Sequence, residues 1–217
     1  MTNYYCLVTG LPDLSLDDGK LNYTVANFKT ELYPQLSKED KKLIDLFYLK
    51  FDNENLLKLL KDKEAVIDAS LGNYSVDELL SVINSFKEEL PPDKKFPSYF
   101  YQFAALYLDS SEEERIGIED QLYGYYYDYA MSSSNAFVSS WYELNLNVNN
   151  ILSALSARKY KMDVARVIVG SNQVAASVCP CTGWFLILPS FFNFAYIFCT
   201  SFVVMKAIFL SPRYGFM

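Results

Sequence analysis

An all-α fold is predicted by three features of the 217-residue sequence. Apolar residues recur at steps of three and four over most of residues 24–166, as in LIDLFYLKF and VDELLSVINSF, which is the spacing of one face of a helix. A serine followed three residues later by an acid, a pair that caps the first turn of a helix, occurs repeatedly. No run of alternating β-branched residues stands out against this background, so we expect no sheet.

The first two expected helices follow such capping pairs. Ser37 and Asp40 open SKEDKKLIDLFYL, and Ser75 and Glu78 open SVDELLSVINSF. Both side chains of a pair accept hydrogen bonds from the free N–H groups at the start of a helix. The second helix is expected to end before the two prolines at 91–92, because proline has no backbone N–H to donate.

A third helix is expected in SSEEERIGIEDQLYGYYYDYA, opened by Ser110 and Glu113, with its acids at the positive end of the helix dipole. Tyr123, Tyr126 and Tyr127 follow at helical spacing. A stacking platform for a ligand is one interpretation of this tyrosine cluster. We expect instead that the three rings line the core, with their hydroxyls reaching the surface.

One stretch of sequence occurs twice. FDNENLLKLLK at 51–61 has a looser copy, LNVNNILSALS at 146–156, in which Asn150 falls 95 residues after Asn55. The apolar pattern, the polar cluster and an upstream aromatic residue coincide, which favours internal duplication over chance. We interpret each copy as a helix–turn–helix corner whose polar residues cap the second helix. The corner residues are Asp52, Glu54, Asn55, Asn147, Asn149 and Asn150.

Composition argues against several functions. The net charge of −7 and the pI near 4.7 disfavour a nucleic-acid partner, because an acidic surface repels phosphates. The chain has no histidine, the commonest general base and zinc ligand. No GxxxxGK loop is present to bind ATP. We therefore expect a protein that is not an enzyme and has no catalytic residue, metal or cofactor; an enzyme built on carboxylates is an alternative that no motif supports.

The C-terminal tail, residues 177–217, differs from the rest of the chain. No charged residue lies between Val167 and Met205, and residues 183–205 are apolar and long enough to span a bilayer. The tail contributes only Lys206 and Arg213 to the charge, so the helical domain at 1–176 has a net charge of −9. The tail is either a transmembrane anchor or the product of a frameshift that replaced the original C-terminal sequence.

Three blocks of sequence resemble a known family. YLKFDNENLLKLLKDKE at 48–64 resembles the tyrosine, acid-rich turn, asparagine and helix signature of the C-type central-stalk component (d-type in eukaryotes) of V- and A-type ATPases. More closely, NYYCLVTGLPDLSLDDGK, ELYPQLSKEDKKLIDLFYLKFDNENLLKLLKDK and ARVIVGSNQVA resemble a bacterial family of formerly unknown function that is encoded beside V-type ATPase genes. The resemblance rests on the order and spacing of the three blocks, covers residues 1–176 and stops at the tail.

The resemblance implies a truncated series of repeated helical units and a non-catalytic role. The C-type component of V-type ATPases lies between the rotor shaft and the membrane ring of proteolipid subunits, and it transmits torque during hydrogen-ion transport. A protein of this kind is peripheral, at the cytoplasmic face of the cell membrane. Within it, we expect Asn55 and Asn150 to be structural caps, and we expect Asp52, Glu54, Asn147 and Asn149 at the equivalent corners to face the shaft. The alternative from a different class is a helical adaptor anchored to the membrane by residues 183–205.

Overall fold

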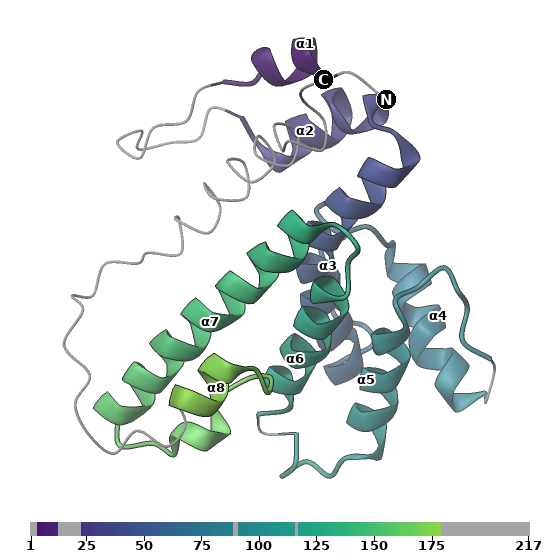
Figure 1. Cartoon of the computed structure of the whole chain (residues 1–217). Helices are drawn as coiled ribbons and strands as arrows, with labels where there is room; N and C mark the ends of the chain where they lie inside the picture. The colour runs from purple at the N-terminus through teal and green to yellow at the C-terminus, as the bar shows by residue number, and fades with distance from the viewer. Residues whose placement is uncertain (1–3, 13–22, 89–90, 116, 179–217) are drawn as a thin grey trace. The chain divides into compact units, whose positions relative to one another are not determined.

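The computed structural model describes residues 4–12, 23–88, 91–115 and 117–178, and all regular structure within these ranges is helical (Figure 1). This confirms the all-α prediction. The described residues divide into two compact units, one up to Tyr48 and one from Leu49 onward. The predicted membrane span at 183–205 lies outside the described residues. Within the described ranges, no helix is both long and apolar enough to cross a bilayer.

The first unit is built around the start of a long helix. It contains α1 (Tyr5–Thr9), α2 (Val25–Glu31), the 3-10 helix η1 (Tyr33–Gln35) and the first part of α3 (Lys38–Lys61). The Tyr4 hydroxyl accepts a hydrogen bond from the Ser37 N–H (2.7 Å) and donates one to the buried Asp40 carboxylate (2.8 Å). These bonds tie the N-terminal segment to the beginning of α3.

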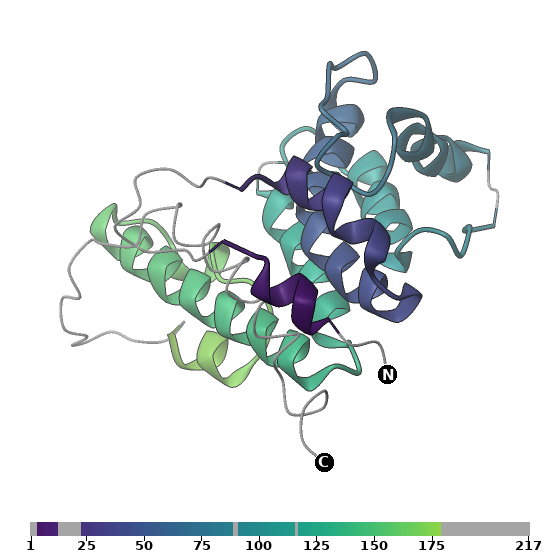
Figure 2. The same ribbon diagram turned by 90° about the horizontal axis from the view of Figure 1, so that it is seen from above.

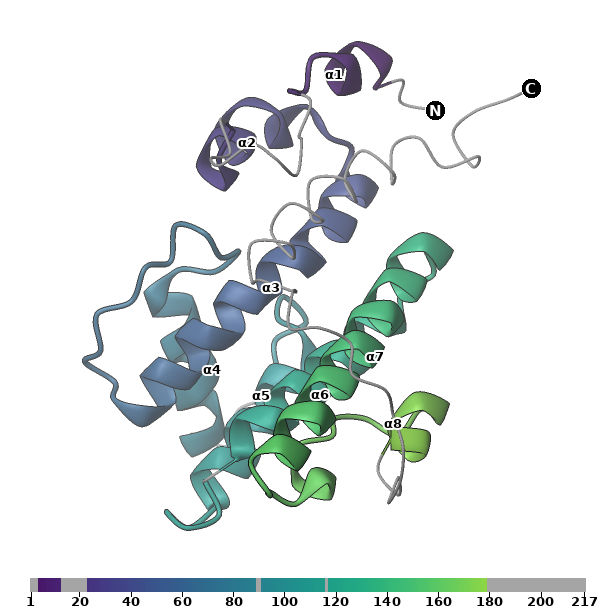
Figure 3. The ribbon, with the colours of Figure 1, turned by 90° about the vertical axis from the view of Figure 1, so that its left-hand side faces the viewer.

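The second unit contains the rest of α3 and the helices that follow it. They are α4 (Val76–Lys87), α5 (Ser98–Asp109), α6 (Ile118–Met131), α7 (Ala136–Lys159), the 3-10 helix η2 (Val164–Arg166) and α8 (Gln173–Val178). Consecutive helices pack on one another, α4 on α5, α5 on α6, α6 on α7 and α7 on α8. Figures 1 and 3 show α8 beside α7.

The expected corners at the repeated stretch are wrong. α3 and α7 are each a continuous helix of 24 residues, and both run through the polar cluster without a break (Figure 3). Figure 2 shows the unbroken length of α7 from above. Asparagine and aspartate lower helix stability by only a few tenths of a kcal/mol per residue, about 0.7 at most relative to alanine. Leucines on both sides keep the helical spacing, and packing of their side chains outweighs that small penalty.

The capping predictions are confirmed for two helices and displaced by one residue for the third. The Asp40 N–H donates to Ser37 Oγ (3.2 Å), and the Glu78 carboxylate accepts from the Ser75 N–H (2.8 Å). In the third segment the pair is Ser111 with Glu114, and it closes a turn rather than opening the helix. α6 begins only at Ile118, because Gly117 has a positive φ of 88° that interrupts the helical path.

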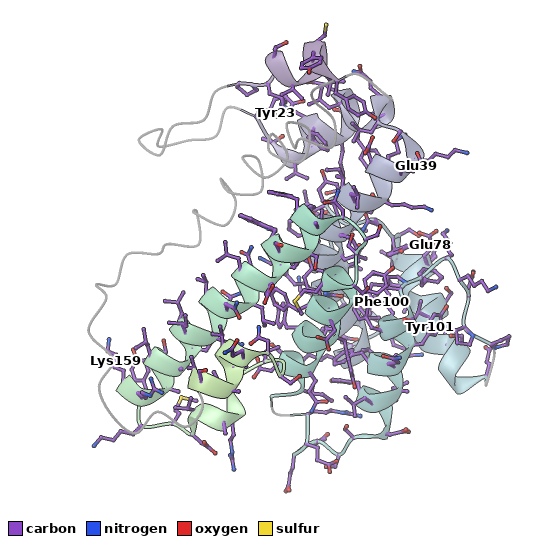
Figure 4. All side chains as sticks on the ribbon, viewed as in Figure 1. Tyr23, Glu39, Glu78, Phe100, Tyr101 and Lys159 are labelled. Carbon is purple, nitrogen blue, oxygen red and sulfur yellow. The ribbon has the colours of Figure 1, made fainter. Side chains whose placement is uncertain are left out.

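Aromatic side chains fill much of the second unit's core. Phe100 and Phe103 of α5 are fully buried, and Tyr99 packs edge-on against Phe100 with ring centroids 4.9 Å apart. Figure 4 shows Phe100 inside the unit. The tyrosine cluster contributes the Tyr126 ring to this core, as predicted, but the Tyr126 hydroxyl does not reach the surface, because it is buried against the Tyr142 hydroxyl. Tyr123 and Tyr127 are half-buried.

Candidate interaction site

The polar residues of the first repeated stretch hold the chain segment that follows α3. Asp52 is fully buried, and its carboxylate accepts hydrogen bonds from the backbone N–H groups of Asn73 (2.9 Å) and Tyr74 (3.2 Å). One turn later, Asn55 donates its side-chain amide to the Asp68 carbonyl (3.0 Å). Two side chains on one face of α3 therefore fix the segment 68–74 against the helix.

The second repeated stretch holds the segment after α7 in a similar way. Asn150 is 2% exposed; its amide donates to the Val169 carbonyl (2.8 Å), and its carbonyl oxygen accepts from the Val169 N–H (3.0 Å). One turn earlier, Asn147 accepts from the Asn172 side-chain amide (2.7 Å). We call each such pair of side chains, Asp52 with Asn55 and Asn147 with Asn150, a polar clasp.

Each clasped segment leads into another helix. The first ends at Ser75, which caps α4 through Glu78. The second ends at Asn172, which accepts a hydrogen bond from the Ala175 N–H (2.8 Å) at the start of α8. The order of long helix, clasped segment and capped helix thus occurs twice, 95 residues apart at Asn55 and Asn150.

The two remaining corner residues lie nearer the surface. Asn149 is half-buried and donates its amide to the Tyr127 hydroxyl (2.8 Å). Glu54 is also half-buried and lies close enough to Tyr123 for its charge to add to the effect of burial, which raises the pKa of that tyrosine. Neither residue caps a helix, because both lie inside α3 or α7.

A network of buried hydroxyls and amides, which the sequence did not indicate, lies between the helices of the second unit. The Tyr99 hydroxyl donates to Asn53 Oδ1 (2.7 Å), and the hydroxyls of Tyr126 and Tyr142 are 2.9 Å apart. Burial raises the pKa of Tyr99 and Tyr142 well above 10, so both hydroxyls stay protonated at neutral pH. In the sequence, the only sign of this network is that asparagine and tyrosine occupy helix positions that face the core.

These groups are arranged to bind chain segments to helices, since their hydrogen bonds join backbone and side chains of this chain. Asn53 Nδ2 is the one described side-chain polar atom that is buried without a hydrogen-bond partner. Within the described ranges, no three acid or cysteine side chains are grouped to hold a metal ion. Asp52 and Asn55 lie one turn apart on α3, and Asn147 and Asn150 lie one turn apart on α7. All four side chains form hydrogen bonds with other segments of the same chain.

Comparison with known proteins identifies one family. Residues 1–181 of the 217 match the model of a family described as protein of unknown function (DUF2764). No curated protein and no solved structure matches the chain. The matched region contains both polar clasps and all of the described helices.

Proposed function

The chain belongs to the DUF2764 family of proteins of unknown function, and we propose that it is a non-catalytic central-stalk subunit of a V-type ATPase. In this role it couples the rotor shaft to the membrane ring of proteolipid subunits during ion transport. It works at the cytoplasmic face of the membrane as a peripheral part of the complex.

The observation that carries the proposal is the polar clasp, which occurs once on α3 and once on α7. The resemblance of the sequence to the C-type central-stalk component of V- and A-type ATPases implies repeated helical units, and two long helices that bind their following segments alike fit that plan. We infer that the two arrangements are copies of one unit. Buried hydrogen bonds between helix and loop also suit a part that transmits torque, because they resist local opening.

The shaft contact that we propose involves fewer residues of this chain than the sequence suggested. Asp52, Asn55 and Asn150 are buried, and their side chains bind segments of this chain. Glu54 is half-buried and charged, and it is the corner residue that we retain as a contact for a basic group of the shaft. Glu54→Lys reverses this charge and is expected to weaken capture of shaft subunits, whereas Glu88→Lys, at an exposed position on another segment, is the matched control.

Affinity capture from native membranes tests the proposal. The tagged full chain is expressed in its own host, the membranes are solubilised in mild detergent, and captured proteins are identified by mass spectrometry. We expect shaft and proteolipid subunits in stoichiometric amounts, together with ATP hydrolysis by the captured material. Capture of the tagged chain without any ATPase subunit would contradict the proposal.

A helical adaptor anchored by residues 183–205 is the second candidate, and the uncharged stretch between Val167 and Met205 is what favours it. Extraction of membranes with alkaline carbonate separates the two. A stalk subunit is released into the supernatant, while a chain anchored by an apolar helix stays with the lipid. Retention in the lipid pellet together with absence of ATPase subunits would favour the adaptor.

A further inference from the structure

Basic and apolar side chains alternate in the turn that leads from α7 to η2. Tyr160 is 68% exposed and Met162 is 58% exposed, and both are interleaved with lysines. Figure 4 shows Lys159 at the end of α7 that leads into this turn. We give the name basic turn to a set of five side chains: Lys159, Tyr160, Lys161, Met162 and Arg166.

The positive charges of the basic turn are not neutralised within the part of the chain that the structure describes. There, neither Lys159 nor Lys161 has an ion-pair partner. The Lys159 ammonium lies 5.5 Å from the centroid of the Tyr160 ring instead. Arg166 Nε is 3.8 Å from Asp163 Oδ2, and both side chains are mostly exposed, so this pair is weak. The basic turn therefore carries a net positive charge.

This charge stands out against the rest of the sequence. Residues 1–143 contain 13 basic and 25 acidic side chains, whereas residues 144–217 contain six basic side chains and one acid, Asp163. Four of the six basic residues lie at 158–166. Such an asymmetry between two parts of a chain is typical of proteins whose basic part binds an anionic partner.

The backbone of the turn favours glycine at a position where this chain has lysine. The Lys161 N–H donates to the Arg158 carbonyl (3.3 Å). The Met162 N–H donates to the Ala157 carbonyl (2.8 Å). These two bonds form a Schellman motif, in which the residue with left-handed backbone is usually glycine. Lys161 has that conformation, with a φ of 56°, and is the one described non-glycine residue with a positive φ. A side chain there strains the backbone, so the needs of the fold do not account for the lysine.

We propose that the basic turn binds the surface of a membrane that contains anionic phospholipids. Lysine and arginine are attracted to lipid phosphates, while tyrosine and apolar side chains enter the interface between the headgroups and the acyl chains. The alternation of the two kinds of side chain in the turn suits this partner, because nucleic acid or an acidic protein would engage the charges and leave Met162 without a contact.

The neighbouring sequence also favours a membrane. The uncharged stretch that begins at Val167 and ends at Met205 directly follows Arg166, and basic clusters beside apolar stretches are typical of segments that bind anionic lipids. Along α7, the nearest acid before the turn is Glu143, which is 16 residues or about 24 Å from Lys159. That distance exceeds the Debye length of about 8 Å at physiological salt, so salt screens the repulsion between this acid and the lipids.

Co-sedimentation with lipid vesicles tests the proposal on the full chain. The vesicles are phosphatidylcholine, with or without phosphatidylglycerol. We expect tighter binding when phosphatidylglycerol is present, and we expect that increase to disappear at high salt. A turn variant that replaces Lys159, Lys161 and Arg166 with glutamine should bind the anionic vesicles at least about tenfold more weakly. Binding to pure phosphatidylcholine, to which residues 183–205 would contribute equally in both chains, should be the same.

A second triple variant is the matched control. Lys38→Gln with Lys42→Gln and Lys58→Gln removes the same charge from exposed positions of α3 and should change binding less than about twofold. Equal weakening in the two triple variants, or equal binding with and without phosphatidylglycerol, would overturn the proposal. Binding of double-stranded DNA that the turn variant loses, without binding to vesicles, would assign the turn to nucleic acid and overturn it as well. The test uses the isolated chain, so its result is independent of the proposed role in an ATPase.

Lys161→Gly separates binding from folding. Glycine adopts a positive φ without strain, so this variant should need more urea to unfold than the native chain. It also removes one positive charge, so its binding to anionic vesicles should be about fivefold weaker. A lysine that served only the fold would give the opposite change in stability. Unchanged vesicle binding by Lys161→Gly would overturn the assignment of this residue to the lipid contact.

Discussion

Single residues in the middle of α3 place polar groups where a buried helix face is usually apolar. Asp52, Asn53 and Asn55 are each at most 4% exposed. Burying a polar group without a partner costs about 1 to 3 kcal/mol, and a carboxylate costs more. Asp52 and Asn55 avoid this cost by accepting from or donating to the backbone of segment 68–74. The polar residues therefore stabilise one particular course of the chain after the helix.

Asn150→Leu is expected to lower the free energy of unfolding by about 2 to 4 kcal/mol. The leucine fits a buried helix position, but the Val169 N–H and carbonyl both lose their partner. Urea denaturation followed by circular dichroism measures the change. Asn145→Leu, at a half-buried position of the same helix where the amide bonds only the Trp141 carbonyl, is the control. An equal loss in both variants would show that the clasp has no special role.

The Ser75–Glu78 cap is expected to make stability depend on pH. Hydrogen bonds from Lys95 and from the Ser75 N–H lower the pKa of Glu78 below its ordinary value of 4.5. A lowered folded-state pKa contributes stability above the unfolded-state pKa, and this contribution is lost as pH falls through the folded-state value. Glu78→Gln should therefore cost about 0.5 to 1 kcal/mol at pH 7, kept small by solvent screening.

The difference between Glu78→Gln and the native chain is measured by urea denaturation at intervals from pH 7 down to the acid limit of folding. We expect the difference to shrink as the pH falls below 4.5. Glu88→Gln, at an exposed acid of the same region, should show no such trend. A difference that stays constant with pH would mean that the carboxylate charge does not stabilise the cap.

Residues that act locally were predictable from the sequence, and residues that act over a distance were not. Ser37 and Ser75 cap helices as expected, because a cap depends on residues only three positions away. Asn55 and Asn150 were identified as important, but their partners lie 13 and 19 residues along the chain. Nothing in a local pattern shows which backbone group such a side chain will meet, so the sequence predicts a helix cap at the positions where the structure has a clasp.

Among the connecting elements, the segment after α3 approaches that helix so closely that it requires a glycine. A Cβ atom added at Gly72 would overlap the Asp52 carboxylate, which accepts bonds from the next two residues. The carboxylate is buried and fixed by those bonds, so it cannot move aside without breaking them. The position of this glycine is therefore set by the clasp.

Gly72→Ala is expected to lower the free energy of unfolding by about 2 to 3 kcal/mol, because the substitution displaces Asp52 and strands buried N–H groups. Gly124→Ala provides the comparison, since its Cβ would meet only Val169 Cγ1 at 3.5 Å within helix α6. That change should be neutral or stabilising by up to about 1 kcal/mol through helix propensity. Urea denaturation of both variants measures the two effects, and equal tolerance of alanine at both sites would contradict the close approach.

At the scale of elements, the sequence predicted which segments are helical better than it predicted where each helix begins and ends. The segments whose apolar spacing indicated helices form α3, α4 and α7 in the structure. The sequence suggested breaks at two polar clusters because asparagine and aspartate often cap the start of a helix, yet tertiary contacts keep α3 and α7 continuous. Conversely, α6 begins later than expected, at Ile118, because Gly117 adopts a conformation outside the helical range.

For the whole molecule, composition and periodicity were enough to predict an all-α chain. The domain boundary at residue 176 stays a prediction, and the family match covers residues 1–181. The division into units at Tyr48 was not predictable, because it falls inside α3, before the polar cluster at which the sequence suggested a break. Periodicity shows which face of a helix is apolar, but not which other helix will cover it.

The stability of the second unit is expected to depend on residues up to about 181 and not on those beyond. Arg158 donates to the Val178 carbonyl (2.8 Å), and Ala175 of α8 is buried. A chain that stops after Cys181 keeps these contacts, so its free energy of unfolding should lie within about 0.5 kcal/mol of the full chain. A chain that stops after Ser171 loses α8 and the Asn172 partner of Asn147, and should lose about 2 to 4 kcal/mol. Urea denaturation followed by circular dichroism compares the three chains, and a large loss already in the longer truncation would show that the C-terminal tail contributes to folding.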